Sequence, residues 1–371
     1  MDILAEFTKV VEKEGEEAAR VKMDAALREI LRNDPAKGRE ILRVLAAPER
    51  ARLARENFTV DGYSAYYWCV FGRDLPKHCL KEWVIPFFEE WNEKKRHRGL
   101  MTEGFRGSTK STVMSSLATF ITGHFPHLSG VNIQKTEDEA TAMSKFMADI
   151  IELNAGWAMV FPHIVPDKDR GWSVSGYNVK DTRMEYGEWV QKAMADHGRD
   201  PSFLAVSVTS GAVGKHPSGW ILFDDIHDYK NTSSRADMAR VVNTMKSDIL
   251  PTLMRPGNQP FALWAYTPWD EEDAYAFVRR SGMFRHVLTP ALREDENGDT
   301  EWEGKKGFLT WPENFGLDEM RLWLRTLGSS DFARMVLCDL TKAGVTLFKY
   351  YAYPHEKIDP LWAAAGGVYY A

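Results

Sequence analysis

The sequence predicts an α/β fold in which a mostly parallel sheet is flanked by helices, with a helical appendage at the N-terminus. Three observations lead to this prediction. Short apolar segments typical of strands alternate with amphipathic helical segments through the body of the chain. A glycine-bearing loop joins the first of these strands to a helix, and a later strand ends in two aspartates. Parallel strands place their carboxyl ends along one edge of the sheet, where ligands bind.

The first 57 residues are predicted to be charged helices. Apolar residues recur there at helical spacing, break off at Asn33-Asp34-Pro35, and resume before Pro48. We expect this appendage either to dock on the body or a partner, or to be a solvated pair of packing helices, which is the simpler interpretation. Its apolar positions are Phe7, Val10 and Val11, then Met23, Ala26, Leu27, Ile30 and Leu31, then Ile41, Leu42 and Leu45.

Residues 58–98 are rich in aromatic side chains and are predicted to be mostly helical. They end in the basic run 94–98, which suits a solvated helix C-terminus and could also meet phosphate. Beyond it, Thr136 and Glu139 have the spacing of a capping box at the start of a helix. The predicted strands are 99–103, 129–134, 202–209, 220–225 and 261–267.

The C-terminal third is less regular. We predict a turn at 296–299 and a helix over 317–327. Residues 366–371 pair two glycines with an apolar run, which resembles the first strand of a further domain. The predicted division is a helical appendage at 1–57, a core at 58–280, a smaller subdomain or linker at 281–365, and the start of a truncated domain at 366–371.

Composition excludes several classes of protein. The net charge of −6 leaves no global basic footprint for nucleic acid, so any such contact would come from a local patch. The three cysteines, Cys69, Cys79 and Cys338, match no zinc or redox spacing and suit a reducing compartment. The sequence contains no H-E-x-x-H zinc motif and no G-x-S-x-G hydrolase motif. It shows no signal peptide and no membrane-spanning apolar run.

The stretch 104–112, GFRGSTKST, has the character of a phosphate-binding loop between a strand and a helix. Its glycines would let the backbone curl, its lysine would reach the β and γ phosphates, and the next serine would bind Mg²⁺. Thr109 stands where the general pattern has a second glycine, so a helix N-terminus with a chance Lys-Ser pair remains the alternative. The predicted ATP-binding residues are Gly104, Arg106, Gly107, Ser108, Thr109, Lys110, Ser111 and Thr112.

A second motif, Ile221–Asp225, is a short apolar strand that ends in two acids, as in a Walker B element. We expect Asp224 to hold the Mg²⁺ shell together with Ser111, and Asp225 to polarise the attacking water. Asp225 is one methylene shorter than the glutamate common at this position, and an acidic surface turn remains the alternative. The two motifs in this order predict a P-loop NTPase core of the RecA/ASCE-like kind that hydrolyses ATP with Mg²⁺.

Further segments follow in the same order. Residues 129–151 form a strand and helix, residues 211–226 join a glycine loop and a His-Pro turn to the acidic strand, and residues 266–273 follow the third core strand. Together with 106–112, these segments resemble the ATPase domain of the large terminase subunit, the DNA-packaging motor of tailed bacteriophages. The resemblance covers roughly residues 75–371 and rests on the combination of motifs rather than on any one of them.

The resemblance implies roles for individual residues. Thr267 would couple hydrolysis to movement, and His78 lies where relatives contact adenine. Family members usually receive an arginine from the neighbouring subunit, and Arg170, Arg183 and Arg199 are equally good candidates here. The implied catalytic residues are Asp225, Arg106 and Lys110, with Arg106 sensing or stabilising the γ phosphate.

The resemblance also implies partners and a location. The chain would drive viral double-stranded DNA into the procapsid from a homo-oligomeric ring of five subunits, with the portal protein and the small terminase subunit as partners. It would act in the host cytoplasm, docked on the portal and outside any membrane. The family's nuclease follows the ATPase, and its first acidic ligand is not reached here, so we expect no DNA cleavage.

Two other functions remain open. The departures at Thr109 and Asp225 are also what a catalytically weak nucleotide-binding assembly module would show. Another P-loop DNA translocase or helicase is the second alternative, although related helicases need a second RecA-like core. The roughly 90 residues beyond 280 are too few for one.

Overall fold

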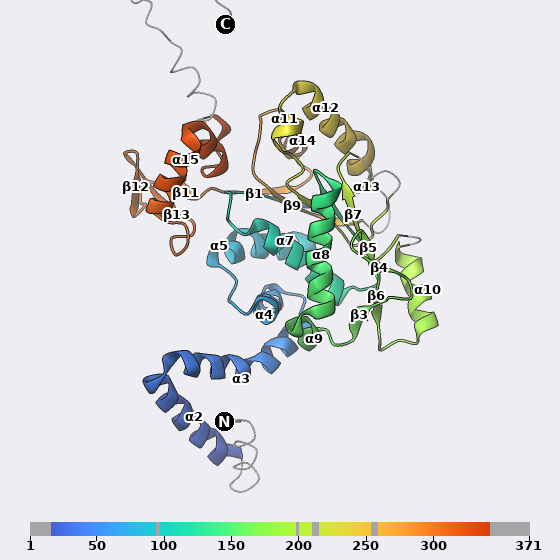
Figure 1. The fold of residues 1–371 in the computed structure, drawn as a ribbon, viewed down its shortest axis with the longest axis vertical. Coiled ribbons are helices and arrows are strands. Elements are labelled where there is room, and N and C mark those ends of the chain that lie inside the picture. The colour runs from blue at the N-terminus through green and yellow to red at the C-terminus, as the bar shows by residue number, and fades with distance from the viewer. Residues whose placement is uncertain (1–15, 94–96, 198–199, 210–214, 254–258, 342–371) are drawn as a thin grey trace, which may run out of the picture.

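The computed structural model describes residues 16–93, 97–197, 200–209, 215–253 and 259–341, and an eight-stranded sheet lies at its centre (Figure 1). The strand order is β10-β1-β9-β8-β2-β7-β5-β4; the first six strands run parallel to their neighbours, and β5 and β4 are antiparallel. The predicted α/β class with a mostly parallel sheet is confirmed. The strands are β1 (Gly99–Gly104), β2 (Gly130–Gln134), β4 (Trp172–Ser173), β5 (Gly176–Tyr177), β7 (Phe203–Ser207), β8 (Trp220–Asp224), β9 (Phe261–Tyr266) and β10 (Arg285–Thr289).

All five predicted strands are present, with ends shifted by a few residues at most. The sequence did not predict β10, which extends the central sheet beyond residue 280 by pairing with β1. Four of its five residues are only partly buried or exposed, and it includes Arg285 and His286, so it lacks the apolar run that marks the other strands.

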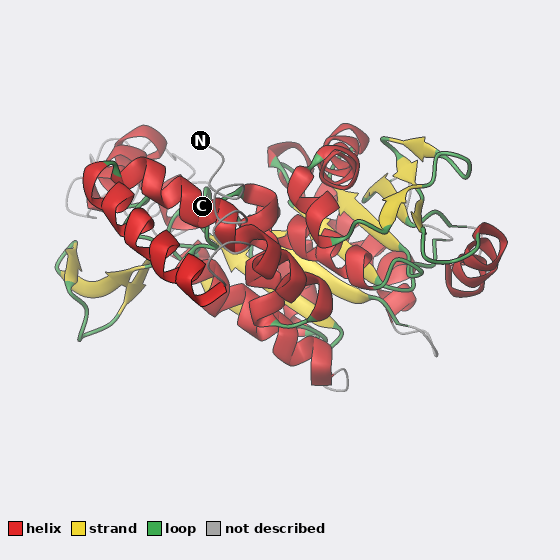
Figure 2. Cartoon of the chain, turned by 90° about the horizontal axis from the view of Figure 1, so that it is seen from below, coloured by secondary structure: helices red, strands yellow, loops and turns green. Residues whose placement is uncertain are grey.

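Helices cover both faces of the sheet (Figure 2). Successive residues of a strand point to opposite faces, so Leu222 packs in the core under one helical layer and Phe223 in the core under the other. The first layer comprises α4 (Val60–Phe71), α6 (Ile85–Glu93), α7 (Lys110–His124), α8 (Glu137–Leu153) and α9 (Ala155–Val160). The second comprises α12 (Arg235–Thr244), the π-helical turn η2 (Met245–Ile249), α13 (Leu250–Leu253) and α14 (Ala274–Arg280).

A small subdomain follows β10. A three-stranded sheet packs with α15 (Leu317–Met335) around a separate core that includes Phe105 of the loop after β1. The predicted turn at 296–299 connects two of its strands. The predicted helix over 317–327 is only the first part of α15, which kinks at Gly328 (φ 78°) and continues. The strands are β11 (Leu292–Glu294), β12 (Thr300–Trp302) and β13 (Lys305–Leu309).

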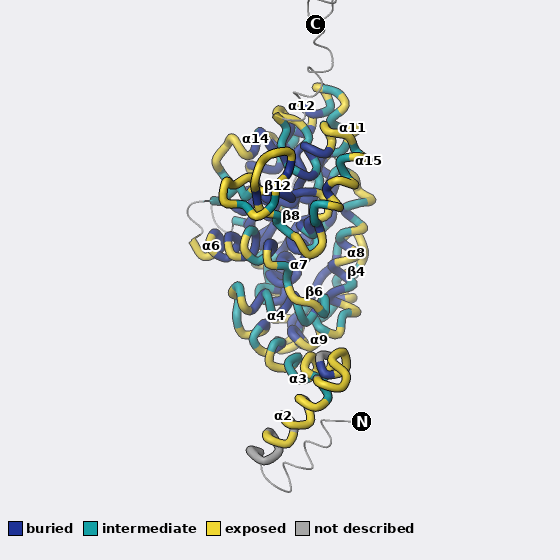
Figure 3. Tube along the Cα trace, turned by 90° about the vertical axis from the view of Figure 1, so that its left-hand side faces the viewer, coloured by how far each residue is buried: buried dark blue, intermediate teal, exposed yellow. Residues whose placement is uncertain are grey.

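The N-terminal helix α2 (Glu16–Asn33) projects away from the body, and α3 (Pro35–Glu56) leads back to it and packs against α4 and α9 (Figure 3). The predicted break at 33–35 is confirmed, because Asp34 caps α3 with Pro35 in its first turn. Helix α3 continues through Pro48. Val44, four residues earlier, is 57% exposed, so water can take the carbonyl bond that proline cannot supply. The later residues Ala51 and Ala54 are buried in the main core.

The remaining elements complete the connections. The predicted capping box at Thr136 is only half formed: its hydroxyl accepts from the Glu139 backbone at 3.3 Å, whereas the Glu139 carboxylate pairs with Lys135 at 2.8 Å. Residues 58–93 are mostly helical, as predicted. The other elements are α5 (Lys77–Cys79), the π-helical turn η1 (Leu80–Val84), β3 (Ile164–Pro166), β6 (Val179–Asp181), α10 (Tyr186–His197) and α11 (Tyr229–Thr232).

Several predictions fall outside the described residues. These are the apolar positions before residue 16, the basic residues 94–96, the glycine-loop residues 211–214, Arg199, and the terminal segment 366–371. Among the described helices, none combines the length and apolar character needed to cross a bilayer.

A buried carboxylate ties three elements together behind the loop after β1. Glu103, whose side chain is 4% exposed, accepts hydrogen bonds at its Oε2 from Tyr266 of β9 (2.9 Å), Arg279 of α14 (2.8 Å) and His286 of β10 (2.8 Å). A charge buried this deeply is tolerated because it is paired and accepts three hydrogen bonds at one oxygen. The cluster fixes the start of the loop relative to both neighbouring strands.

We predict that Glu103→Gln lowers the free energy of unfolding by about 2 kcal/mol, because it leaves a partly buried guanidinium without its anion. Urea unfolding at pH 7 measures the change. Glu89→Gln is the matched control, since Glu89 pairs with Arg285 at a site that is 52% exposed, and we expect about 0.5 kcal/mol or less. Equal losses in the two variants would contradict a special role for the Glu103 cluster.

Candidate functional site

The loop between β1 and α7 adopts a curled backbone. Gly107 has φ 89°, a conformation that favours glycine. A Cβ added at Gly104 would lie 3.1 Å from Ser108 Oγ and 3.4 Å from Lys110 Cδ, so the lysine stem passes close over this glycine. The loop ends at the N-terminus of the 15-residue helix α7, whose first backbone N–H groups have no partner within the helix. Such an end attracts anions.

Thr109 stands where the general phosphate-loop pattern has glycine, and it adopts the left-handed conformation (φ 66°). This conformation strains a β-branched residue. Its hydroxyl donates to the carbonyl of Ser108 at 2.6 Å and lies 3.3 Å from Cys79 Sγ. These local bonds offset part of the strain, so the backbone keeps the shape expected of glycine although the side chain differs.

Lys110 lies at the centre of the site and is buried, with 6% exposure. Its Nζ donates to Thr267 Oγ1 at 3.1 Å, and that hydroxyl donates in turn to the carbonyl of Gly104 at 3.1 Å. Among the described residues, Lys110 forms no ion pair. A buried ammonium with only a neutral partner is unfavourable by itself, and an anion bound at the loop would supply the missing charge.

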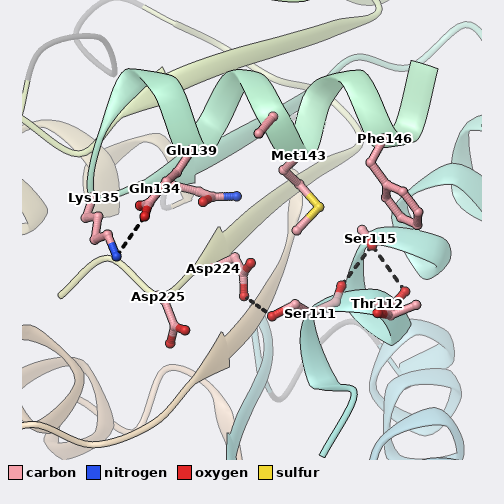
Figure 4. Close-up of a pocket in the computed structure, with 11 residues that line it drawn as sticks. Ser111, Thr112, Ser115, Gln134, Lys135, Glu139, Met143, Phe146, Asp224 and Asp225 are labelled. Atoms are coloured by element: carbon pink, nitrogen blue, oxygen red, sulfur yellow. Dashed lines mark hydrogen bonds and ion pairs between the residues drawn. The ribbon is translucent and has the colours of Figure 1, made fainter. Parts of the chain in front are cut away.

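Ser111 and Asp224 meet across the gap between α7 and β8. Ser111 Oγ donates to Asp224 Oδ1 at 2.7 Å (Figure 4). Burial, and secondly the charge of the adjacent Asp225, raises the pKa of Asp224 to about 7. The carboxylate at the end of β8 is therefore held in a place where its charged form is costly without a nearby cation.

Asp225 follows with φ 40°, and its backbone N–H donates to the carbonyl of Ala265 on β9 at 3.1 Å. Within the described part of the chain, its Oδ1 is buried and has no hydrogen-bond partner. A carboxylate oxygen in this state is available for a water or ligand.

A cleft of about 410 Å³ opens beside these residues (Figure 4). The hydroxyls of α7 form one wall, the two aspartates one end, and α8 the opposite wall. The ion pair between Lys135 and Glu139 lies near the acidic end, whereas the α8 wall beyond it is apolar. The lining residues are Ser111, Thr112, Ser115, Gln134, Lys135, Glu139, Ala142, Met143, Phe146, Asp224 and Asp225.

The structure brings most of the predicted site residues together. Lys110 contacts Thr267, and Ser111 contacts Asp224, with Asp225 lining the same cleft. Arg106 lies differently: its side chain is exposed, and its backbone N–H donates to the carbonyl of Met335 at the end of α15 at 2.8 Å. The loop is thus attached to the small subdomain through Arg106.

The other candidates lie in varied surroundings. His78 is buried, with Nε2 3.1 Å from the carbonyl of Ser108 and its ring 4.8 Å from that of Trp311, and burial lowers its pKa. Arg183 pairs with Asp181 at 2.6 Å. Arg170 has a buried Nη1 without a partner among the described groups. None of these three is among the residues that line the cleft.

Two further residues that line the cleft, Gln134 and Lys135, are not among the site residues predicted from the sequence. Gln134 is the last residue of β2 and Lys135 follows it, and β2 lies beside β8. Their position at the carboxyl end of a parallel strand is the signal that could have identified them. The strand order needed to apply it is not visible in the sequence.

The residues at this site fit Mg²⁺. The described chain contains no group of three or more His, Cys, Asp or Glu side chains arranged as a metal site. A Mg²⁺ ion in phosphoryl-transfer enzymes needs less than that, because it keeps several waters and uses one or two protein oxygens together with the phosphates. The Ser111 hydroxyl and the Asp224 carboxylate provide such a pair.

No protein-family model matches the chain, and no curated protein matches it significantly. The interpretation therefore rests on the residues and their geometry.

The raised pKa of Asp224 predicts that this residue lowers the stability of the folded chain by an amount that depends on pH. A carboxyl whose folded-state pKa lies above its unfolded value of 3.8 binds its proton more tightly in the native state, so stability falls as pH rises from about 4 to 7. We expect Asp224→Asn to have a higher free energy of unfolding than the parent at pH 8, by on the order of 3 kcal/mol. At pH 5 this increase in the free energy of unfolding should be smaller.

Urea unfolding with EDTA at both pH values measures this gain. Asp149→Asn, at a 43% exposed position on α8, is the control and should show a small difference at both pH values. A gain for Asp224→Asn that does not change with pH would contradict the raised pKa.

The left-handed Thr109 predicts a contrast between two substitutions. Thr109→Gly relieves backbone strain but increases the entropy of the unfolded chain, so we expect a net change within about 1 kcal/mol. Thr109→Val keeps the branched shape and loses the hydroxyl bond, so we expect it to cost about 1–2 kcal/mol. Thermal unfolding of both variants tests this. A glycine variant less stable than the valine variant would show that Thr109 is not strained.

Proposed function

We propose that this chain is a Mg²⁺-dependent ATPase of the P-loop class, and that it is the ATPase part of a large terminase, which drives viral double-stranded DNA into a procapsid. The observation that carries the ATPase proposal is the buried Lys110 ammonium without an anionic partner among the described residues, beside the Ser111–Asp224 pair. Both lie at the carboxyl edge of a parallel sheet, where α/β proteins bind ligands.

The proposed chemistry is in-line attack of water on the γ phosphate, in which the protein contributes positioning and charge. The amides of the 104–110 loop and Lys110 would bind the phosphates. Ser111 and Asp224 would hold Mg²⁺, which when bound neutralises phosphate charge. Asp225, with its unpartnered oxygen, would orient the water. Asp224 gives up its proton more readily once a cation lies beside it, because a nearby positive charge lowers a carboxyl pKa.

The strand order supports the RecA/ASCE-like assignment. In an open parallel sheet, groups at the carboxyl ends of nearby central strands can act on one ligand. Here β9 lies between β1 and β8. The residue after β9, Thr267, bonds the phosphate-loop lysine directly, which supports a role for it in relaying the state of the nucleotide.

The packaging role rests on the order of motifs that resemble terminases. In that role the chain would form a ring of five subunits in the host cytoplasm, docked on the portal protein, with the small terminase subunit and viral DNA as partners. A helicase with two cores is less well supported: apart from the eight-stranded sheet, the described residues form only a three-stranded and a two-stranded sheet. A nucleotide-binding assembly module is the remaining alternative.

Two substitutions test the ATPase proposal. Lys110→Ala should abolish Mg²⁺-ATP turnover, because it removes the cation that reaches the β and γ phosphates. Asp225→Asn should preserve ATP binding and lower kcat by about 100-fold or more, because it removes the group that orients water. Phosphate release and fluorescent-nucleotide titration measure the two quantities.

Lys145→Ala is the matched control, since Lys145 is an exposed lysine on α8 that pairs with Asp149. It should leave both quantities unchanged. Turnover that persists in Lys110→Ala would overturn the phosphate-loop assignment. Nucleotide binding without any turnover by the parent chain, at all protein concentrations, would favour the assembly module.

A further inference from the structure

His227 connects the loop that follows β8 to the segment that follows β9. It is buried, with 1% exposure, three residues after Asp224. Its Nε2 lies 3.0 Å from the backbone nitrogen of Ala274 at the start of α14, and its Nδ1 lies 2.9 Å from Asn231 Oδ1 on α11. Its own backbone N–H points to the hydroxyl of Tyr275 at 3.4 Å.

The partners of the imidazole determine where its proton lies. A backbone N–H can only donate, so Nε2 must accept the bond from Ala274 and carry no hydrogen. Nδ1 therefore carries the proton and donates to Asn231 Oδ1. The Asn231 amide is oriented independently, because its Nδ2 donates to the carbonyl of Ile226 at 3.1 Å and its Oδ1 also accepts from the Asp228 backbone. Burial, which lowers the pKa of His227, favours this neutral form although Asp273 and Asp228 are near.

The two segments that the imidazole joins carry different parts of the site. The loop after β8 carries Asp225, and the segment after β9 carries Thr267, which contacts Lys110. The second segment is itself rigid, because the Asp273 carboxylate accepts from the backbone N–H groups of Trp269, Asp270 and Ala276. A shift of this segment would reach the β8 loop through the Ala274–His227 bond.

Asp225 lies between two such anchors. Its backbone N–H is bonded to Ala265 of β9, and two residues later His227 is bonded to Ala274. The left-handed φ of 40° at Asp225 is a conformation that persists only where its surroundings hold it. Without the imidazole, the loop would keep the bond from Asp225 to Ala265, the bond from Asn231 to the Ile226 carbonyl, which ties it only to α11, and the weak bond to Tyr275.

We propose that His227 is a positioning residue, which holds the Asp225 carboxylate in place relative to Thr267 through the hydrogen bond from Ala274 to its Nε2. The proposal rests on the ATPase function proposed above. It adds that the segment after β9, which carries Thr267, and the loop after β8, which carries Asp225, move together through this hydrogen bond.

Two substitutions separate the bonds of His227. Glutamine can place its Oε1 near the position of Nε2 and accept from Ala274, whereas asparagine is shorter and reaches only the Asn231 side. We expect His227→Asn to lower kcat by about 10- to 100-fold, the effect of misplacing a reacting group by about 1 Å. His227→Gln should recover most of this loss. The Kd for Mg²⁺-ATP should stay within about threefold of the parent in both, because neither substitution touches the phosphate loop.

The measurements are kcat, the Kd for Mg²⁺-ATP and the thermal unfolding midpoint of each variant, with assays run well below that midpoint. Tyr275→Phe is the matched control: it removes the weak bond to the His227 backbone but leaves both imidazole bonds, so kcat should stay within about twofold. Two results would overturn the proposal. One is a lower kcat in His227→Asn that His227→Gln does not restore at equal folded fraction. The other is a kcat in His227→Asn equal to that of the parent.

These outcomes are distinct from failure of the proposed function. If the parent chain does not hydrolyse ATP, or Lys110→Ala still does, the ATPase assignment fails, and this inference fails with it. If the parent hydrolyses ATP and depends on Lys110, only the comparison of the two His227 variants decides.

Discussion

The site depends on one buried charge. The Lys110 ammonium lies where the loop after β1, the start of α7 and the end of β9 meet, and a neutral hydroxyl is its partner there. Moving a cation out of water without an anion is costly, so the surrounding structure must hold the lysine in place. The close passage of its stem over Gly104 and the Thr267 bond to the Gly104 carbonyl do so. An anion bound beside Lys110 would offset the unfavourable free energy of burying its ammonium group.

The order of strands decides which side chains can contact Lys110. Because β9 lies between β1 and β8, the residue after β9 reaches Lys110. The two acids at the end of β8 lie one strand farther away, and Asp224 contacts Ser111 there. A carboxylate directly beside Lys110 would pair with it and occupy the place that we propose for a phosphate. The sheet therefore separates the cation from the acids while keeping both at one edge.

The sequence predicts the pieces of this site better than their arrangement. The buried strands were recognisable because they are apolar runs, and α7 because its apolar residues recur at helical spacing. The contact between Lys110 and Thr267 could not be predicted from periodicity, because it depends on which strands are neighbours. His227 gave no signal at all, since its importance comes from the backbone N–H of Ala274, 47 residues later.

The second acid shows why backbone position matters here. Aspartate reaches one methylene less far than glutamate, so Asp225 cannot adjust its reach by rotating a longer side chain. Its carboxylate is placed almost wholly by the backbone, which is left-handed at this residue and anchored on either side. The adjacent Asp224 adds repulsion, since a buried carboxylate and a half-buried one side by side resist being ionised together. A short acid beside a like charge thus depends on the loop that carries it, and the neutral imidazole of His227 makes that loop continuous with the segment that contacts the lysine.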